Sequence, residues 1–403
     1  MNLKQLVILI VLVVILGGAG LAIYHKQNAA QSAGNSDLGK KVLPNFPIND
    51  VSEISIQHDT NVVHLARKND LWRVAERHDY PANFSQISGF LIKARDLKAV
   101  QTEEVGASQL PRLQLATGHG TNSPTEVKFT GANDKAIATL LLGKMHMNTR
   151  GAGGDGPGWP DGRYVKSAAA PDVSVISETF ENIEPKPEQW LDKDFIKVEK
   201  ARSIEVNFPV ETNSWKLTRE SESGTWKLAD AKGDEKLDSS KISGLSNPLS
   251  SPTFNDVAFG DQLEKHGTNQ PTVIKIETFD GFNYTVNVGS KTNEDYPITV
   301  AVIADLQKER TPGKDEKPED KAKLDKEFQA QQQKLADKLK QEQGFQNWTY
   351  LVSSWTMDPL LKERSQLLEE KKESAENESK TNSVSNVSEP KLENPPLPAV
   401  KQK

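Results

Sequence analysis

A three-strand pattern that occurs twice constrains the fold of this 403-residue chain more than any other feature. In each occurrence, apolar and polar residues alternate in three short runs separated by polar turn residues, which predicts an antiparallel meander with one buried face. The runs are Ile54-x-Ile56, Val63-x-Leu65 and Trp72-x-Val74, and then, about 150 residues later, Ile204-x-Val206, Trp215-x-Leu217 and Trp226-x-Leu228. We expect Trp72 and Trp226 to be core residues rather than a platform for carbohydrate.

An amphipathic helix is expected to lie on the apolar face of each meander. After the first meander, apolar side chains recur at helical spacing over residues 84–97, and Asn83 is a suitable N-cap. The counterpart in the second copy begins at Asp238. It is the weaker helix of the two, because it contains Gly244 and has Pro248 near its end.

Further strands complete each copy. The segments around Leu142-Gly143 and Val288-Gly289 each close a pair of alternating strands, and Asp280-Gly281 is a hairpin signal between the two strands of the second pair. We predict an α+β fold of two tandem repeats, each an antiparallel meander plus helix and further strands, behind an N-terminal transmembrane helix. The predicted segments are 1–26 for the cytoplasmic start and membrane anchor, 27–50 for a flexible tether, 51–200 for the first repeat, 201–370 for the second and 371–403 for a disordered tail.

Arg163-Tyr164-Val165 resembles Thr349-Tyr350-Leu351-Val352, and their larger offset indicates that about 40 extra residues entered the second copy before this second segment. This charged insertion lies at about 305–344, and we expect the glycine-rich residues 151–158 to fill the corresponding place in the first copy. The apolar residues of the insertion form a narrow helical stripe, which we expect to dock on its own copy or on a partner helix. These residues are Leu324, Phe328, Leu335 and Leu339. The alternative is that the insertion forms a solvated charged helix. Beyond the insertion we predict a strand over 348–352 and a helix opened by Asp358-Pro359.

An uncharged, mainly apolar run from Leu6 to Tyr24 precedes all of this. A helix of this length spans about 28 Å at 1.5 Å per residue, close to the roughly 30 Å hydrocarbon core of a bilayer. It predicts a single-pass anchor in the cell membrane, with the bulk of the chain extracytoplasmic (periplasmic). A cleavable signal peptide is the alternative, because Gly20-Leu21-Ala22 offers small residues at suitable positions.

Composition narrows the classes of function. The net charge of −6 is spread along the chain, so we expect no nucleic-acid partner. The chain has no cysteine, which excludes disulfides, thiolate metal sites and cysteine nucleophiles.

The residues nominate no catalytic, cofactor-binding or metal-binding site. His58 and His64 lie on adjacent predicted strands and form the one candidate metal pair, while Asp155 and Asp161 form a weak calcium candidate. The glycine-rich loop at 151–158 lacks the Lys-Ser/Thr ending of a phosphate-binding loop. We therefore predict a protein that is not an enzyme, and an active site assembled from scattered residues is the remaining alternative.

Several motifs resemble those of a bacterial family of membrane-anchored proteins with a domain of unknown function. They are Leu71-Trp72-Arg73-Val74, the Tyr80-Pro81-Ala82 entry to a helix, and Leu142-Gly143 at the close of a strand. Members of that family are often encoded beside gliding-motility-type ABC transporter components. The resemblance implies an accessory or scaffold subunit of an ABC-type transport or envelope complex, with permease or ATPase subunits as partners. The alternative is a periplasmic binding module for envelope glycan or peptide, with its site between the two copies.

Overall fold

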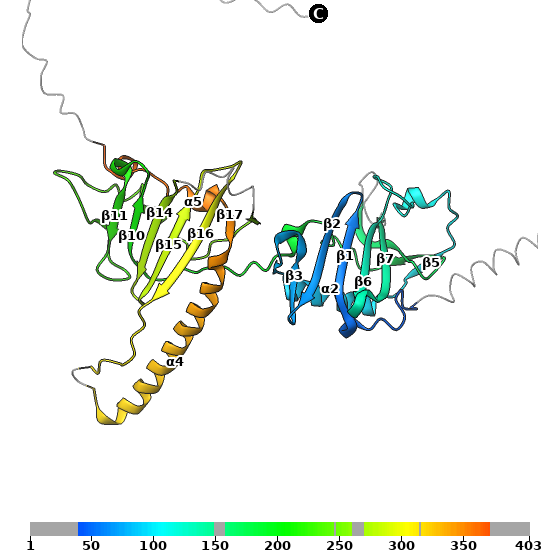
Figure 1. Cartoon of the computed structure of the whole chain (residues 1–403), viewed down its shortest axis with the longest axis horizontal. Helices are drawn as coiled ribbons and strands as arrows, with labels where there is room; N and C mark the ends of the chain where they lie inside the picture. Colours follow the sequence, from blue (N-terminus) through cyan, green and yellow to red (C-terminus); the bar gives the residue numbers. More distant parts are fainter. Residues whose placement is uncertain (1–38, 149–157, 246, 260–269, 314–315, 371–403) are drawn as a thin grey trace, which may run out of the picture.

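The structure, a computed structural model, describes residues 39–148, 158–245, 247–259, 270–313 and 316–370. These residues form two antiparallel sheets with few helices, a sheet-dominated α+β arrangement (Figure 1). None of the helices in these ranges combines the length and the hydrophobicity that a bilayer span requires. The predicted anchor, Leu6–Tyr24, and the predicted tail, 371–403, lie outside the described residues.

The first sheet has nine strands in the order β4-β3-β2-β1-β6-β7-β8-β9-β5, and all neighbours are antiparallel. The strands are β1 (Val51–His58), β2 (Asn61–Lys68), β3 (Leu71–Val74), β4 (Tyr80–Pro81), β5 (Gln101–Glu103), β6 (Thr125–Gly131), β7 (Ala136–Asn148), β8 (Trp159–Ser167) and β9 (Val173–Ile176). Short 3-10 helices lie between them, namely η1 (Ile48–Asp50), η2 (Ala75–Arg77), η3 (Leu110–Leu113), η4 (Ala132–Asp134) and, after β9, η5 (Pro187–Trp190).

The first predicted meander is confirmed. Ile54 of β1 pairs with Leu65 of β2, which in turn pairs with Val74 of β3, and all three side chains are fully buried. Because the apolar residues occupy alternate positions, this register brings them to one face. The core also begins earlier than residue 51, since Val42 and Phe46 of the predicted tether are buried in it.

The first predicted helix is α2 (Phe84–Asp96), and it is also confirmed. The Asn83 side chain accepts a hydrogen bond of 3.0 Å from the backbone N–H of Gln86, so the cap is the predicted one. The helix buries Ile87 and Phe90 against the sheet, and the Phe90 ring lies 5.7 Å from the ring of Phe129 on β6.

The second sheet has eight antiparallel strands in the order β12-β11-β10-β14-β15-β16-β17-β13. The strands are β10 (Ala201–Asn207), β11 (Trp215–Thr218), β12 (Lys227–Leu228), β13 (Asp256–Ala258), β14 (Thr272–Thr278), β15 (Phe282–Val288), β16 (Asp295–Ala304) and β17 (Thr349–Ser353). The helical elements of this half are η6 (Glu211–Asn213), η7 (Ser243–Leu245), α4 (Pro318–Gln343), η8 (Gly344–Asn347), α5 (Ser354–Met357) and α6 (Arg364–Leu367).

The strand orders of the two sheets follow the same path through the chain. On one side of β1 lie β2, β3 and the short β4, and on one side of β10 lie β11 and β12, so that β4 has no counterpart in the second sheet. The later strands are added on the other side in both sheets, with β5 or β13 at the far edge. A bulge also interrupts the same pairing in each sheet, between Val51 and Glu53 in β1 and between Ala201 and Ser203 in β10.

Two predicted helices are absent from the described part of the chain. The segment from Asp238 buries Ile242 and Leu245 as expected, but it forms turns and the 3-10 helix η7. Gly244 and Pro248 disfavour a longer helix there. Asp358-Pro359 does not open a helix either, because Asp358 is instead the C-cap of α5.

The charged insertion and the glycine-rich residues do not occupy corresponding places in the two sheets. The charged residues, with α4, connect β16 to β17, whereas the glycine-rich residues 151–158 lie between β7 and β8. The mistake came from matching β8 with β17. In the structure, Val165 of β8 pairs with Leu142, while Tyr350 of β17 pairs with Ile298 of β16. Alternating strands of similar composition look alike in sequence, so period two alone does not identify the neighbour.

Candidate functional site

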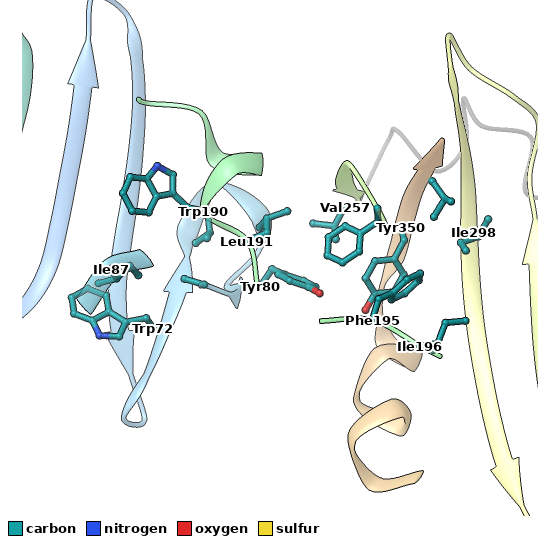
Figure 2. Packing of buried hydrophobic residues seen from close by; sticks show 14 of the residues in the cluster. Trp72, Tyr80, Ile87, Trp190, Leu191, Phe195, Ile196, Val257, Ile298 and Tyr350 are labelled. Carbon is teal, nitrogen blue, oxygen red and sulfur yellow. The ribbon is translucent and has the colours of Figure 1, made fainter. Parts of the chain in front are cut away.

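The junction between the two sheets is the place where the most chemically distinctive side chains meet. One continuous core of buried residues runs from the first sheet through this junction into the second. Figure 2 shows Tyr80 and Leu191 on one side, facing Val257, Phe195 and Tyr350 on the other. The edge of the first sheet that carries β3 and β4 lies at this junction, and so does the edge of the second that carries β13 and β17.

An ion pair joins the two halves at this junction. The guanidinium of Arg77, on η2, donates two hydrogen bonds of 2.7 Å to the carboxylate of Asp256 on β13. Glu188 approaches the same guanidinium at 3.5 Å. The hydrogen bonds that Arg77 donates to Asp256 are the main reason that the pKa of Arg77 is raised. A bidentate pair of this kind fixes orientation as well as distance.

Aromatic rings fill the space beside this ion pair. The Tyr80 ring, from β4, lies 4.8 Å from the ring of Trp348 and 6.2 Å from that of Tyr350, both in edge-to-face geometry. Tyr350 also contacts Phe254 at 4.9 Å and Phe195 at 4.5 Å between ring centroids. Such pairs contribute about 0.5–1.5 kcal/mol each beyond the burial of their area.

The two tyrosines of this cluster are buried deeply enough to change their ionisation. Burial raises the pKa of both Tyr80 and Tyr350. The Tyr350 hydroxyl is buried and forms no hydrogen bond of good geometry with any described residue, although the Tyr80 hydroxyl is near enough to contribute to the shift of its pKa. An unsatisfied buried hydroxyl costs free energy, so packing rather than hydrogen bonding holds this side chain in place.

The segment that connects the sheets is part of the same junction. It crosses the edge of β4, where the backbone N–H of Asn83 donates to Trp190 and that of Asp192 donates to Pro81. Lys193 then donates hydrogen bonds to the carbonyl oxygens of Phe254 and Asn255, at 3.3 and 2.8 Å. Burial lowers the pKa of Lys193. The junction therefore has a covalent link, an ion pair and an aromatic core.

Helix α4 is attached to the second sheet by its C-terminal half. Leu335 and Leu339 pack against the core, so this part of the predicted stripe docks on its own copy. Leu324 and Phe328, nearer the start of the helix, are half-buried, and Arg310 forms an ion pair with Asp325 there at 2.8 Å. Figure 1 shows the N-terminal part of α4 extending beyond the end of the sheet.

A buried carboxylate fixes the end of α4. Glu342, with 3% of its surface exposed, accepts hydrogen bonds from the backbone N–H of Lys197 at 2.9 Å and from the Tyr284 hydroxyl at 2.7 Å. Burial raises the pKa of the Glu342 carboxyl. Sequence analysis did not single out this residue, because glutamate is common on both faces of a charged helix.

A separate cavity of about 620 Å³ lies at the end of the second sheet, beside α5. Trp355, 87% exposed, stands at this cavity, and three prolines contribute to its lining. The prolines are Pro248, Pro252 and Pro359. An indole this exposed offers its flat face to a ligand or to another protein.

The histidine and aspartate candidates are not brought together as metal sites. His64 pairs with Glu76 at 2.7 Å, while His58 bonds to the carbonyl of Pro124 at 3.3 Å. His64 lies opposite Ser55 and His58 lies opposite Asn61, so the period-two pattern directs the two rings to opposite faces of the sheet. Within the described ranges, no three His, Asp or Glu side chains are grouped to hold a metal ion.

The calcium candidate is only partly within the described residues. Asp161 forms an ion pair with His146 at 2.6 Å, and Asp155 lies outside the described ranges. The two tryptophans that led to the repeat are both packed, since Trp72 is 7% exposed and Trp226 lies against the core with Arg219 over its ring at 4.6 Å.

The comparisons with known proteins give one finding. A domain of unknown function, DUF4340, is found over residues 72–271. No curated protein and no solved structure matches the chain. The DUF4340 match starts in β3 and ends just before β14, so it contains both Arg77 and Asp256 and crosses the junction between the sheets. It names no activity and no transporter.

Proposed function

We propose that the protein is a non-catalytic, membrane-anchored extracytoplasmic scaffold, an accessory subunit of an ABC-type transport or envelope complex. The observation that carries the proposal is the junction between the halves. Arg77 binds Asp256 there, Tyr80 packs against Tyr350, and Lys193 donates to the carbonyl oxygens of Phe254 and Asn255. Two sheets fixed in this way present a wide surface of constant shape, which suits assembly rather than the closure of an active site. The apolar run at the N-terminus and the family resemblance supply the membrane setting.

We also propose that the two halves are copies of one unit. The shared strand order and the shared bulge support this, and so do two hydrogen bonds at each sheet's edge. In the first half, Asn83 donates to Trp190 and Asp192 donates to Pro81. In the second, the bonds run from Asp238 to Leu367 and from Glu369 to Lys236.

The equivalent hydrogen bonds and strand registers indicate which residues of the two copies correspond. Glu235 of the second copy corresponds to Tyr80 of the first, and Ser174 of the first corresponds to Tyr350 of the second. The two outer edges therefore lack the aromatic residues that form the junction. A head-to-tail contact between like units can repeat and form a filament. Because the outer edges have Glu235 and Ser174 in place of the two tyrosines, they should not form a second junction of this kind.

The exposed half of α4 is the proposed contact for a partner helix. Leu324 and Phe328, in the first half of the helix, are half-buried and do not belong to the core cluster, whereas Leu335 and Leu339 pack against the core. A helix that presents a narrow apolar stripe is a common partner for a second helix.

Affinity purification of the full chain from detergent-solubilised membranes, followed by mass spectrometry, tests the scaffold. Permease or ATPase subunits should be recovered with the chain, and recovery of the chain alone would refute the proposal. A variant with Leu324→Ser and Phe328→Ser should lose the partner at α4. Lys321→Ser with Lys326→Ser, at two exposed positions of the same helix, is the matched control and should retain it.

The exposed Trp355 favours a second candidate, a binding module for envelope glycan or peptide. Its site would be the cavity beside α5 rather than the space between the copies, which packed aromatic side chains fill. Titration of the full chain with cell-wall fragments should then quench tryptophan fluorescence, and Trp355→Ala should abolish the change. An unchanged signal in the wild-type chain would exclude this candidate.

A further inference from the structure

The face of the first half where the described chain begins has an unusual composition. Gly39 lines a cavity of about 640 Å³ together with the end of α2, the segment that follows it and Ser177-Glu178. Backbone hydrogen bonds tie this entry point to the body, because Gly39 donates to Ala99 and Ala99 donates to Lys40. The first described residue is thus held against the end of α2.

Positive charge gathers on this face. Among the described residues, five cationic side chains and the two carboxylates Asp96 and Glu178 lie on or beside the cavity, and their charges sum to +3 in a chain whose net charge is −6. The cationic residues are Lys40, Lys41, Lys93, Arg95 and Lys98. The basic region ends at β5, where Glu103 and Glu104 follow.

Two apolar side chains are exposed among these charges. Ile92 on α2 is 46% exposed and Val100, before β5, is 50% exposed, and both line the cavity. We call the surface formed by the five cations, Ile92 and Val100 the entry face. Basic side chains around a few exposed apolar ones are typical of surfaces that rest on anionic lipid headgroups.

The position of the entry face in the chain points to the same partner. Fourteen residues, 25–38, separate the predicted anchor from Gly39. At no more than about 3.5 Å per residue they reach at most about 50 Å, so the anchor would keep Gly39, and the entry face beside it, within that distance of the bilayer.

We infer that the entry face lies on the surface of the bilayer and binds its anionic headgroups, so that the scaffold has a fixed orientation on the membrane. The inference rests on the proposed membrane anchoring and adds to it a second, electrostatic contact. Each cation near an anionic surface strengthens binding by about fivefold, and the effect weakens as salt is added. Ile92 and Val100 would insert at the level of the headgroups.

The absence of native cysteine allows a direct test in the full chain. A single nitroxide label is placed through Val100→Cys, and in a second sample through Ile303→Cys, which is 67% exposed on β16 of the other half. Both chains are reconstituted in lipid nanodiscs with either neutral or anionic lipid. The collision rate of each label with a water-soluble relaxation agent is then measured.

We expect the label at position 100 to be at least fivefold less accessible in anionic than in neutral discs, and the label at position 303 to be equally accessible in both. Lys41→Glu with Lys98→Glu should abolish the protection at position 100. Lys275→Glu with Lys232→Glu makes the same change of charge on the second half and should leave the protection at position 100 intact. The control is matched because Lys275 is paired with Glu205 at 3.7 Å, much as Lys41 is paired with Asp96 at 3.8 Å. Equal accessibility at position 100 in both lipids would overturn the inference.

The same samples distinguish loss of the membrane anchor from loss of the contact made by the entry face. A chain that does not remain with the nanodisc after an alkaline wash refutes the membrane anchor, and with it the proposed function. A chain that remains with the disc but keeps residue 100 in water refutes only the contact of the entry face.

Discussion

Arg77 and Asp256, which are 179 residues apart in the chain, form a bidentate ion pair that joins the two sheets. Their side chains are 18% and 23% exposed, so water screens the pair less than it screens a surface pair. The pair also lies beside packed aromatic rings that exclude water from one side. These features make it the natural place to test whether the halves unfold together.

A double-mutant cycle on this pair measures the coupling. Arg77→Ala and Asp256→Ala should each destabilise the protein, because each leaves a partly buried charge without its partner, and the cycle should give a coupling energy of about 1–2 kcal/mol. Urea unfolding supplies the free energies. Lys227 and Glu220, an ion pair with 65% and 85% exposure, are the control and should show no measurable coupling, because water screens them. Equal coupling for both pairs would contradict the role of the junction.

Two buried tyrosines should respond in opposite ways to loss of the hydroxyl. Tyr350→Phe removes a buried oxygen that forms no hydrogen bond of good geometry with the described residues, so the free energy of unfolding should stay constant or rise by up to about 1 kcal/mol. Tyr284→Phe removes the 2.7 Å hydrogen bond to Glu342 and should cost about 1.5–3 kcal/mol. Thermal unfolding of the two variants, side by side, decides the matter. A greater loss for Tyr350→Phe would show that its hydroxyl has a partner.

Local patterns predicted the strands well and their neighbours less well. Ile54, Leu65 and Val74 were placed on one face because period two is a property of the strand itself. The match of β8 with β17 failed because both strands alternate in the same way, and pairing is decided by contacts far away in the chain. The segment that begins at Asp238 buries its leucine and isoleucine as predicted but does not form the predicted helix, because Gly244 and Pro248 disfavour a helix despite the apolar spacing.

The junction between the two sheets could not be predicted from the sequence. Arg77 and Asp256 are ordinary surface residue types, and no local pattern connects two residues at such a separation. Tyr80 was noticed only as part of the entry to α2, and Phe254 lies in a loop without periodicity. Residues that meet through tertiary packing alone can be recognised when the edges of the two sheets are known to meet.

The buried carboxylate of Glu342 should make stability depend on pH. Its pKa is raised in the folded protein, so its favourable contribution is complete below the unfolded value of about 4.5 and is lost as the pH rises through the folded value. Glu342→Gln cannot ionise, and its stability relative to the wild type should therefore increase from pH 4 to pH 8. Denaturant titrations across this range provide the measurement, and a relative stability that is flat or falls with pH would contradict burial as the cause.

Glu235 should contribute to stability with the opposite pH dependence. Its hydrogen bond with Arg364 lowers the pKa of the carboxyl to about 2. Its contribution is therefore present above the unfolded value of about 4.5 and is lost as the pH falls toward 2. Glu235→Gln should be more destabilising at pH 6 than at pH 3, and the same unfolding measurements test this. A penalty that does not change with pH would mean that the ion pair adds nothing to stability.

Gly281 is required by its conformation and by its neighbour. The residue has a φ of +84°, and a Cβ atom there would lie 2.4 Å from the carbonyl oxygen of Asp305. Asp305, where the charged insertion starts, also donates its backbone N–H to Gly281 at 2.9 Å, so the two backbones cannot easily separate. Gly281→Ala should cost roughly 3 kcal/mol, from left-handed strain and from displacement of this backbone. Gly233→Ala, with a φ of +58° and open space around it, should cost only about 1 kcal/mol. Urea midpoints distinguish the two, and equal losses would show that backbone strain alone makes Gly281 necessary.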